Sequence, residues 1–203
     1  MGGKKVKSNP LKPYRAVIAF GCLAAAAAPA TPVPLSAQGA HPEAPDELEQ
    51  YGQFVGSWRC AGQSLQPDGK WQKSPGLATW TWYYVLDGHA IQDVWHPATE
   101  AGPDAAVGTN LRIYDAEAGL WRMVWATATQ SHFDTFRATY RDGEILMYGE
   151  RPPSKAYGAH LARITFHNID ARHFDWKYES SGPADARRWR EVARLSCDRA
   201  GEM

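Results

Sequence analysis

The sequence predicts an all-β protein: an antiparallel up-and-down β-barrel of about ten strands with a short N-terminal helix. Three observations support this. Short runs rich in β-branched and aromatic residues recur at regular intervals, each bounded by a turn signal such as Asp-Gly. From residue 57 onward, no 3.6-residue apolar period is long enough for a core helix. A meander of this length curls, and closure removes the unpaired edges that invite aggregation.

Residues 1–37 have the composition of an export signal. Basic residues come first, and the apolar segment 16–28 is too short to span a bilayer comfortably. Small residues permit cleavage after Ala30 or Ala37, and the sequence does not choose between them. We therefore predict a periplasmic or secreted protein with no stable membrane insertion after cleavage. A lipid anchor at Cys22 and an uncleaved anchor are the alternatives.

Residues 38–47 are rich in Pro, Ala and Gly and are predicted to form a flexible linker. From Pro45 onward, acidic residues come first and apolar residues follow at helical spacing, which predicts a short lid or plug helix. The barrel then covers 48–199, and 200–203 form a tail. Its predicted strands are 57–65, 70–74, 78–86, 89–96, 107–114, 120–128, 133–141, 144–151, 161–168 and 173–180, with an eleventh candidate at 187–197.

The segment 78–97 contains the clearest predicted hairpin. Asp87-Gly88 lies between two runs rich in β-branched and aromatic residues, the strongest short-range sign of a two-residue type I′ turn. Because side chains alternate along a strand, counting outward from this turn places four pairs on one face. The pairs are Leu86 with His89, Tyr84 with Ile91, Trp82 with Asp93, and Trp80 with Trp95. This face is an aromatic wall with one carboxylate in it, so we predict that it lines the barrel.

Side-chain alternation on later strands extends the inner face. A loop at 116–119 sets Tyr114 opposite Trp121, and the Asp142-Gly143 turn sets Phe136 opposite Gly149. Ile164 and Phe166 share the inner face with Trp176, which turns His167, His173, Asp175 and Lys177 outward. The predicted ligand-binding residues are Trp80, Trp82, Tyr84, Asp93, Trp95, Asn110, Arg112, Tyr114, Trp121, Trp125, Phe136 and Trp176.

Asp93 is the most informative of these residues. A lone carboxylate among aromatic rings is costly, so it must be protonated or paired. Arg112, on the next strand and the same face, is the expected partner. Three roles follow for the pair: a structural ion pair, an anchor for a polar group of a ligand, or catalysis with Asp93 as general acid or base.

Composition and motifs limit the function. Lys plus Arg equals Asp plus Glu at 22 each, so no net charge favours a nucleic acid partner. The seven histidines lack ligand spacing, so no metal site is expected. Phosphate-loop, dinucleotide and hydrolase motifs are missing from the sequence. An isomerase, cyclase or lyase that uses Asp93 and Arg112 remains the enzyme alternative.

Cys60 and Cys197 lie on the first and last predicted strands, which become neighbours when the barrel closes. In an oxidising compartment a disulfide between them is expected. It would close a long loop and stabilise the fold by at most about 4 to 5 kcal/mol in the chain-entropy model.

Gly56-x-Trp58 on the first strand after a short helix, the run of Asp-Gly hairpins and the arginines of the terminal strand resemble features of the calycin superfamily, which includes lipocalins, fatty-acid-binding proteins and nitrobindins. The chain most resembles an uncharacterised group of bacterial lipocalin-like proteins, which share Leu86-Asp87-Gly88-x-Ala90-Ile91-Gln92-Asp93-x-Trp95 and Leu111-Arg112-x-Tyr114-Asp115. The resemblance covers 48–199 and implies a calycin-like barrel in which an arginine, here Arg188, Arg190 or Arg194, covers Trp58. Nitrobindin-like members bind haem through a late-strand histidine. Since 174–203 contain no histidine, no haem or other cofactor is expected.

These observations predict an exported barrel that binds a small hydrophobic or aromatic molecule in an aromatic-lined interior. Two alternatives remain open, namely the enzyme described above and an envelope protein with a filled barrel. The sequence leaves the ligand and the oligomeric state unknown.

Overall fold

The computed structural model describes residues 36–98, 106–153, 158–182 and 188–201. The chain divides into two compact units, 1–33 and 34–203, and all the described residues belong to the second. Residues 1–35 of the predicted signal peptide lie outside the described residues.

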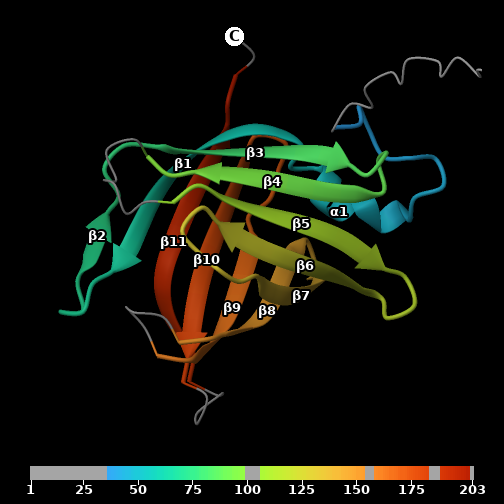
Figure 1. The fold of residues 1–203 in the computed structure, drawn as a ribbon. Coiled ribbons are helices and arrows are strands. Elements are labelled where there is room, and N and C mark those ends of the chain that lie inside the picture. Colours follow the sequence, from blue (N-terminus) through green and yellow to red (C-terminus); the bar gives the residue numbers. More distant parts are fainter. Residues whose placement is uncertain (1–35, 99–105, 154–157, 183–187, 202–203) are drawn as a thin grey trace, which may run out of the picture. The chain divides into compact units, whose positions relative to one another are not determined.

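The described chain is almost entirely β-structure (Figure 1). A 3-10 turn, η1 (Asp46–Leu48), leads into one turn of helix, α1 (Glu49–Gly52). The strands are β1 (Gly56–Leu65), β2 (Trp71–Lys73), β3 (Ala78–Val85), β4 (Ala90–His96), β5 (Gly108–Asp115), β6 (Leu120–Thr127), β7 (Asp134–Arg141), β8 (Glu144–Arg151), β9 (His160–His167), β10 (His173–Ser181) and β11 (Arg190–Arg199).

All the described strand pairings are antiparallel, and the sheet closes on itself. Its order is β11-β10-β9-β8-β7-β6-β5-β4-β3-β1-β2, and β11 also pairs with β1. Strands β1 and β3 to β11 therefore form a closed ten-stranded barrel, with β2 attached outside the ring (Figure 1). This confirms the predicted fold class. The eleventh candidate strand is present as β11, and its pairing with β1 closes the barrel.

The hairpin predicted at 78–97 has the expected register but a wider turn. Trp82 pairs with Asp93 and Trp80 with Trp95, as predicted. The last strand pair is Val85 with Ala90, so Leu86 and His89 belong to a four-residue turn and not to the ladder. Leu86, Asp87 and Gly88 all have positive φ (51°, 54° and 82°). A four-residue turn closed by the 85–90 pair leaves the register unchanged, which is why counting from Asp87-Gly88 gave the correct partners.

The segment before η1 lies against this turn. The backbone N–H of Ala37 donates to the carbonyl of Tyr84 at 2.8 Å, and that of His41 donates to the carbonyl of Gly88 at 3.1 Å. A Cβ at Gly88 would lie 2.5 Å from the backbone nitrogen of His41. Glycine at position 88 thus permits both the positive φ and the close approach of this segment.

Candidate functional site

The barrel interior is filled at the end where β1 begins. Tyr51 and Phe54, from α1 and the turn after it, are fully buried there. The Phe54 ring centroid lies 5.1 Å from that of Trp82, and the Tyr51 centroid lies 4.8 Å from that of Trp121. Phe174, also fully buried, lies 4.9 Å from Phe54. We call this the closed half of the barrel.

Contacts at the start of β1 hold Tyr51 and Phe54, which together we call the plug, in place. The indole N–H of Trp58 donates to the carbonyl of Phe54 at 2.7 Å. Arg199, near the end of β11, covers Trp58, with its guanidinium carbon 4.2 Å from the ring centroid. The same guanidinium donates to the carbonyls of Val55 and Gln53, each at 2.8 Å. The covering arginine is therefore Arg199, and not one of the three expected.

The other half of the interior is hollow. A cavity of about 330 Å³ lies inside the barrel, toward the end where β2 pairs with β1. Its lining is mostly aromatic and aliphatic, with a few polar side chains. The lining residues are Gly62, Gln63, Ser64, Ser74, Trp80, Trp95, Asn110, Arg112, Trp125, Phe136, Met147, Arg151, Ile164, Phe166, Trp176, Tyr178, Ala193 and Leu195. We call this the open half.

A buried ion pair separates the two halves. Nη1 of Arg112 lies 2.5 Å from Oδ2 of Asp93, and both side chains are fully buried, so the predicted pair is present. Asp93 also accepts from the backbone N–H of Asn110 at 3.2 Å and from its side-chain amide at 3.3 Å. The guanidinium carbon of Arg112 lies 4.3 Å from the Trp82 ring centroid and 4.8 Å from that of Tyr51. Pairing and ring contacts together compensate the two buried charges.

Burial also determines the ionisation of Tyr51. Loss of solvent raises the pKa of its phenol well above the ordinary value, and the nearby positive charge of Arg112 opposes this only in part. The hydroxyl therefore remains protonated at physiological pH, and the closed half gains no further charge.

Several polar atoms next to the cavity have no hydrogen-bond partner among the described residues. They include the indole Nε1 of Trp80 and Oδ1 of Asn110. Each residue is at most 6% exposed, so bulk solvent has little access to form hydrogen bonds with these atoms. An unpaired buried polar atom costs about 1 to 3 kcal/mol.

Two sets of interacting polar side chains flank the aromatic lining of the cavity. Nη2 of Arg151 lies 3.0 Å from Oδ2 of the buried Asp134, which also accepts from the Gln130 amide at 2.7 Å. Nε2 of His160 lies 2.9 Å from the hydroxyl of Tyr178. The sequence analysis missed these residues, although alternation from Phe136 and Gly149 would have placed Asp134 and Arg151 on the inner face.

The predicted binding residues divide between the two halves. Seven of them line the cavity: Trp80, Trp95, Asn110, Arg112, Trp125, Phe136 and Trp176. The other five, Trp82, Tyr84, Asp93, Tyr114 and Trp121, are not among its lining residues. Trp82 and Trp121 pack on the plug, and Tyr114 packs on Trp121 at 5.4 Å. Alternation predicts whether a side chain points inward, but not how far along the barrel it lies.

The sequence analysis also missed part of the apolar lining. Ile164 and Phe166 were assigned to the inner face and do point inward, but they were not selected as binding residues. Met147 and Leu195 likewise line the cavity.

The disulfide between Cys60 and Cys197 is present and confirms that prediction. The two residues face each other across the β1–β11 pair that closes the barrel. The bond therefore secures the strand pair on which closure depends.

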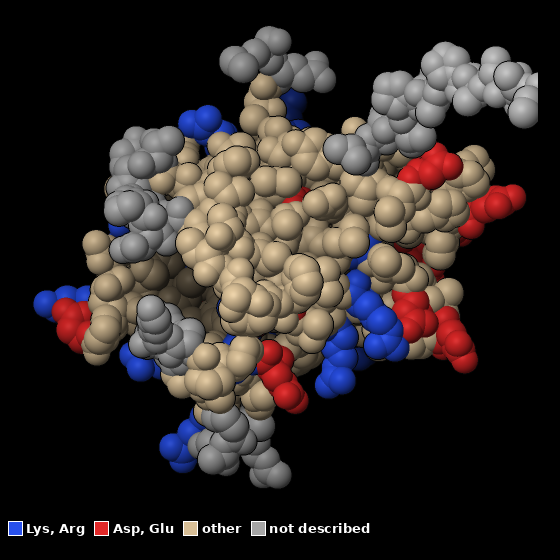
Figure 2. All heavy atoms as spheres, in the orientation of Figure 1, with Lys and Arg blue, Asp and Glu red and all other residues tan. Residues whose placement is uncertain are grey.

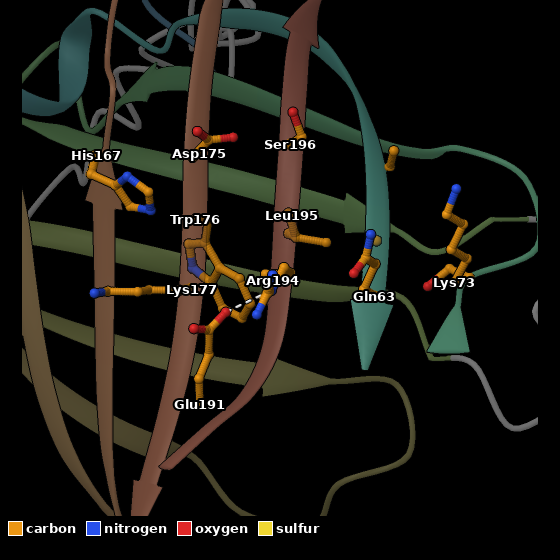
Figure 3. Close-up of a pocket in the computed structure, with 13 residues that line it drawn as sticks. Gln63, Lys73, His167, Asp175, Trp176, Lys177, Glu191, Arg194, Leu195 and Ser196 are labelled. Atoms are coloured by element: carbon orange, nitrogen blue, oxygen red, sulfur yellow. Dashed lines mark ion pairs between the residues drawn. The ribbon is translucent and has the colours of Figure 1, made fainter. Parts of the chain in front are cut away.

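A groove of about 570 Å³ runs over the outside of β1, β2, β10 and β11 (Figure 3). His167, Asp175 and Lys177, which alternation predicts to face outward, are among its lining residues. Arg194 pairs with Glu191 at 2.7 Å there. The groove and the cavity share five lining residues, Gly62, Gln63, Ser74, Trp176 and Leu195, so they lie next to each other.

On the face shown in Figure 2, the centre is mostly uncharged and the charged side chains lie around it, with several acidic ones gathered on the right-hand side of the view. Within the described residues, no group of three or more His, Cys, Asp or Glu side chains is arranged to hold a metal ion. In the same part of the chain, no helix is long and apolar enough to cross a membrane.

Comparison with known proteins adds no relative. No protein-family model matches the chain, and no curated protein matches its sequence. The closed antiparallel barrel is compatible with a calycin-like fold.

Proposed function

We propose that this protein binds a small, flat, largely apolar molecule in the open half of its barrel. The cavity of about 330 Å³ is the observation that carries the proposal. Its volume lies at the lower end of the range for small-molecule sites, about 300 to 1,000 Å³, which favours a compact ligand.

The lining supports a flat ligand. Trp80 and Trp95 meet edge to face with ring centroids 5.3 Å apart, and Trp176 and Tyr178 form a second aromatic pair at 6.1 Å. Trp125 lies against Gly108, where a Cβ would come within 2.2 Å of the indole. Aromatic rings held in this way offer extended surfaces for stacking.

The enzyme alternative has weaker support. The Asp93 carboxylate is fully buried, pairs with Arg112 and accepts two hydrogen bonds from Asn110. It is not among the lining residues, so it is poorly placed to exchange a proton with a ligand. The filled-barrel alternative describes the closed half and not the open half.

We further propose that the protein is an exported member of the calycin superfamily. The disulfide supports an oxidising compartment, since such bonds rarely persist in a reducing cytosol. The ten-stranded closure and the N-terminal plug support the superfamily assignment.

Native mass spectrometry of the protein purified from its own host tests the binding proposal. We expect a retained small molecule that is released on denaturation. In Ala193→Trp, which places an indole in the cavity lining, we expect that molecule to be lost. The control Thr139→Trp adds the same ring at an exposed outward position and should retain it. A molecule retained equally by both variants would contradict binding in the cavity.

A further inference from the structure

We propose that the ligand is uncharged and carries a hydrogen-bond donor beside an acceptor at its inner end, as a primary amide or a lactam does. This inference rests on the proposed function and specifies the ligand chemistry of the same cavity. The proposal rests on the polar atoms without a partner at the end of the cavity nearest the Asp93–Arg112 pair, which we call its inner end.

The unpartnered acceptor is Oδ1 of Asn110. The side-chain nitrogen of Asn110 donates to Oδ2 of Asp93 at 3.3 Å, and its backbone N–H donates to Oδ1 at 3.2 Å. The bond from the side-chain nitrogen fixes the orientation of the amide, because a flipped amide would place its oxygen against a carboxylate. Oδ1 therefore faces away from Asp93, and Asn110 lines the cavity. A ligand must supply a donor to satisfy it.

The unpartnered donor is the indole Nε1 of Trp80, which is buried without a partner among the described residues. Trp80 lines the same cavity as Asn110. A ligand satisfies this donor with an acceptor such as a carbonyl oxygen. The inner end of the cavity thus offers a donor beside an acceptor, the complement of an amide edge.

Charge balance favours a neutral group over a carboxylate. Arg112 already pairs with Asp93, and Arg151 already pairs with Asp134. A ligand anion at the inner end would be one negative charge in excess, close to the Asp93 carboxylate and buried among aromatic rings. A carbonyl accepts the same hydrogen bonds without bringing that charge.

Three probes with one ring system test this proposal: 2-naphthamide, 2-naphthoate and naphthalene. Their affinities are measured by isothermal titration calorimetry at pH 7 on the full disulfide-bonded barrel. We expect 2-naphthamide to bind about tenfold more tightly than either of the others, which corresponds to the effect of pairing buried groups that are otherwise unpaired.

The other outcomes distinguish this proposal from the proposed function. Tightest binding of 2-naphthoate would overturn the uncharged ligand but retain the binding cavity. Equal binding of naphthalene and 2-naphthamide would overturn the polar anchor and also retain the cavity. Failure of all three probes to bind would overturn the proposed function itself.

Two variants localise the effect. Asn110→Leu keeps the side-chain volume but removes Oδ1, so the preference for 2-naphthamide over naphthalene should fall to less than about threefold. Gln92→Leu is the matched control, since Gln92 lies on the outer face of β4 and bonds Thr109. It should retain the full preference.

If Asn110→Leu folds poorly, Trp80→Phe removes the indole donor, keeps an aromatic ring and should reduce the same preference. An unchanged preference in a folded Asn110→Leu or Trp80→Phe protein would overturn the assignment.

Discussion

The two halves of the barrel interior are built on the same strands and the same inward-facing pattern, yet one is filled and the other is hollow. Trp82 and Trp80, two residues apart on β3, illustrate the difference. Trp82 is 1% exposed and packs on Tyr51 and Phe54, whereas Trp80 borders the cavity. The plug at the start of the barrel accounts for the contrast. Strand alternation sets the direction of each side chain, and a segment outside the sheet decides which half is solid.

The largest expected effect lies in the closed half. Phe54→Ala removes a fully buried ring of the plug, so we expect a loss of about 3 to 5 kcal/mol in the free energy of unfolding. Phe136→Ala is the matched change in the open half, where one side of the ring already faces the cavity. It should cost roughly half as much. Denaturant unfolding of both variants measures the difference, and equal losses would contradict the contrast between the halves.

The disulfide should stabilise both halves, because it joins the strand pair that closes the ring. Replacing Cys60 and Cys197 together by serine should lower the free energy of unfolding by about 2 to 4 kcal/mol. Thermal unfolding with and without reductant provides the measurement. The wild-type protein in reductant should match the double variant, and a wild-type protein insensitive to reductant would show that the bond does not form in solution.

In the open half we expect an effect on binding more than on stability. Trp125→Leu removes a half-buried cavity wall and should cost less than about 2 kcal/mol of stability. Affinity for the retained ligand or for 2-naphthamide should fall about tenfold or more. Comparing unfolding and calorimetry on the same sample separates the two effects. A strongly destabilised protein with intact affinity would reverse the roles assigned to the halves.

The smallest expected effect concerns His173, which lies on the outside of β10. Its Nδ1 lies 2.8 Å from Asp198, and the hydrogen bond to that carboxylate is the main reason that the pKa of His173 is raised. A raised pKa in the folded state means that the protonated form stabilises the fold. This stabilisation is complete below about pH 6.5, the unfolded value, and is lost as the pH rises through the folded pKa.

We expect this contribution to be less than about 1 kcal/mol, because the pair is partly exposed. Unfolding measured between pH 5 and pH 9 should show the decline in the wild-type protein and not in His173→Gln. The affinity of the cavity for 2-naphthamide should not change across the same range in either protein. A parallel change in affinity would couple the outer face to the open half and contradict their independence.

Residue alternation and turn chemistry were sufficient to predict much of this structure. They gave the Trp82–Asp93 register, the Asp93–Arg112 pair and the disulfide, because each depends on strand pairing that local sequence determines. They did not identify Arg199 as the residue that covers Trp58. That contact depends on how far β11 continues, and β11 runs to Arg199, two residues beyond the predicted end.

Depth along the barrel was the property that the sequence did not predict. Trp121 and Trp125 lie on the same strand and the same face, yet Trp121 packs on the plug and Trp125 lines the cavity. The outcome depends on where Tyr51 and Phe54 enter, which is a tertiary contact without a local signal. The Asp134–Arg151 pair, by contrast, follows from the register that pairs Phe136 with Gly149, because it lies one step further along the same face of the β7–β8 hairpin.

Xenon binding to crystals of the protein under pressure tests the central contrast most directly, because xenon occupies apolar cavities. We expect xenon sites in the open half, between Trp95, Trp125 and Trp176, and none beside Tyr51 and Phe54. Xenon among the plug residues, or an open half that takes up none, would contradict it.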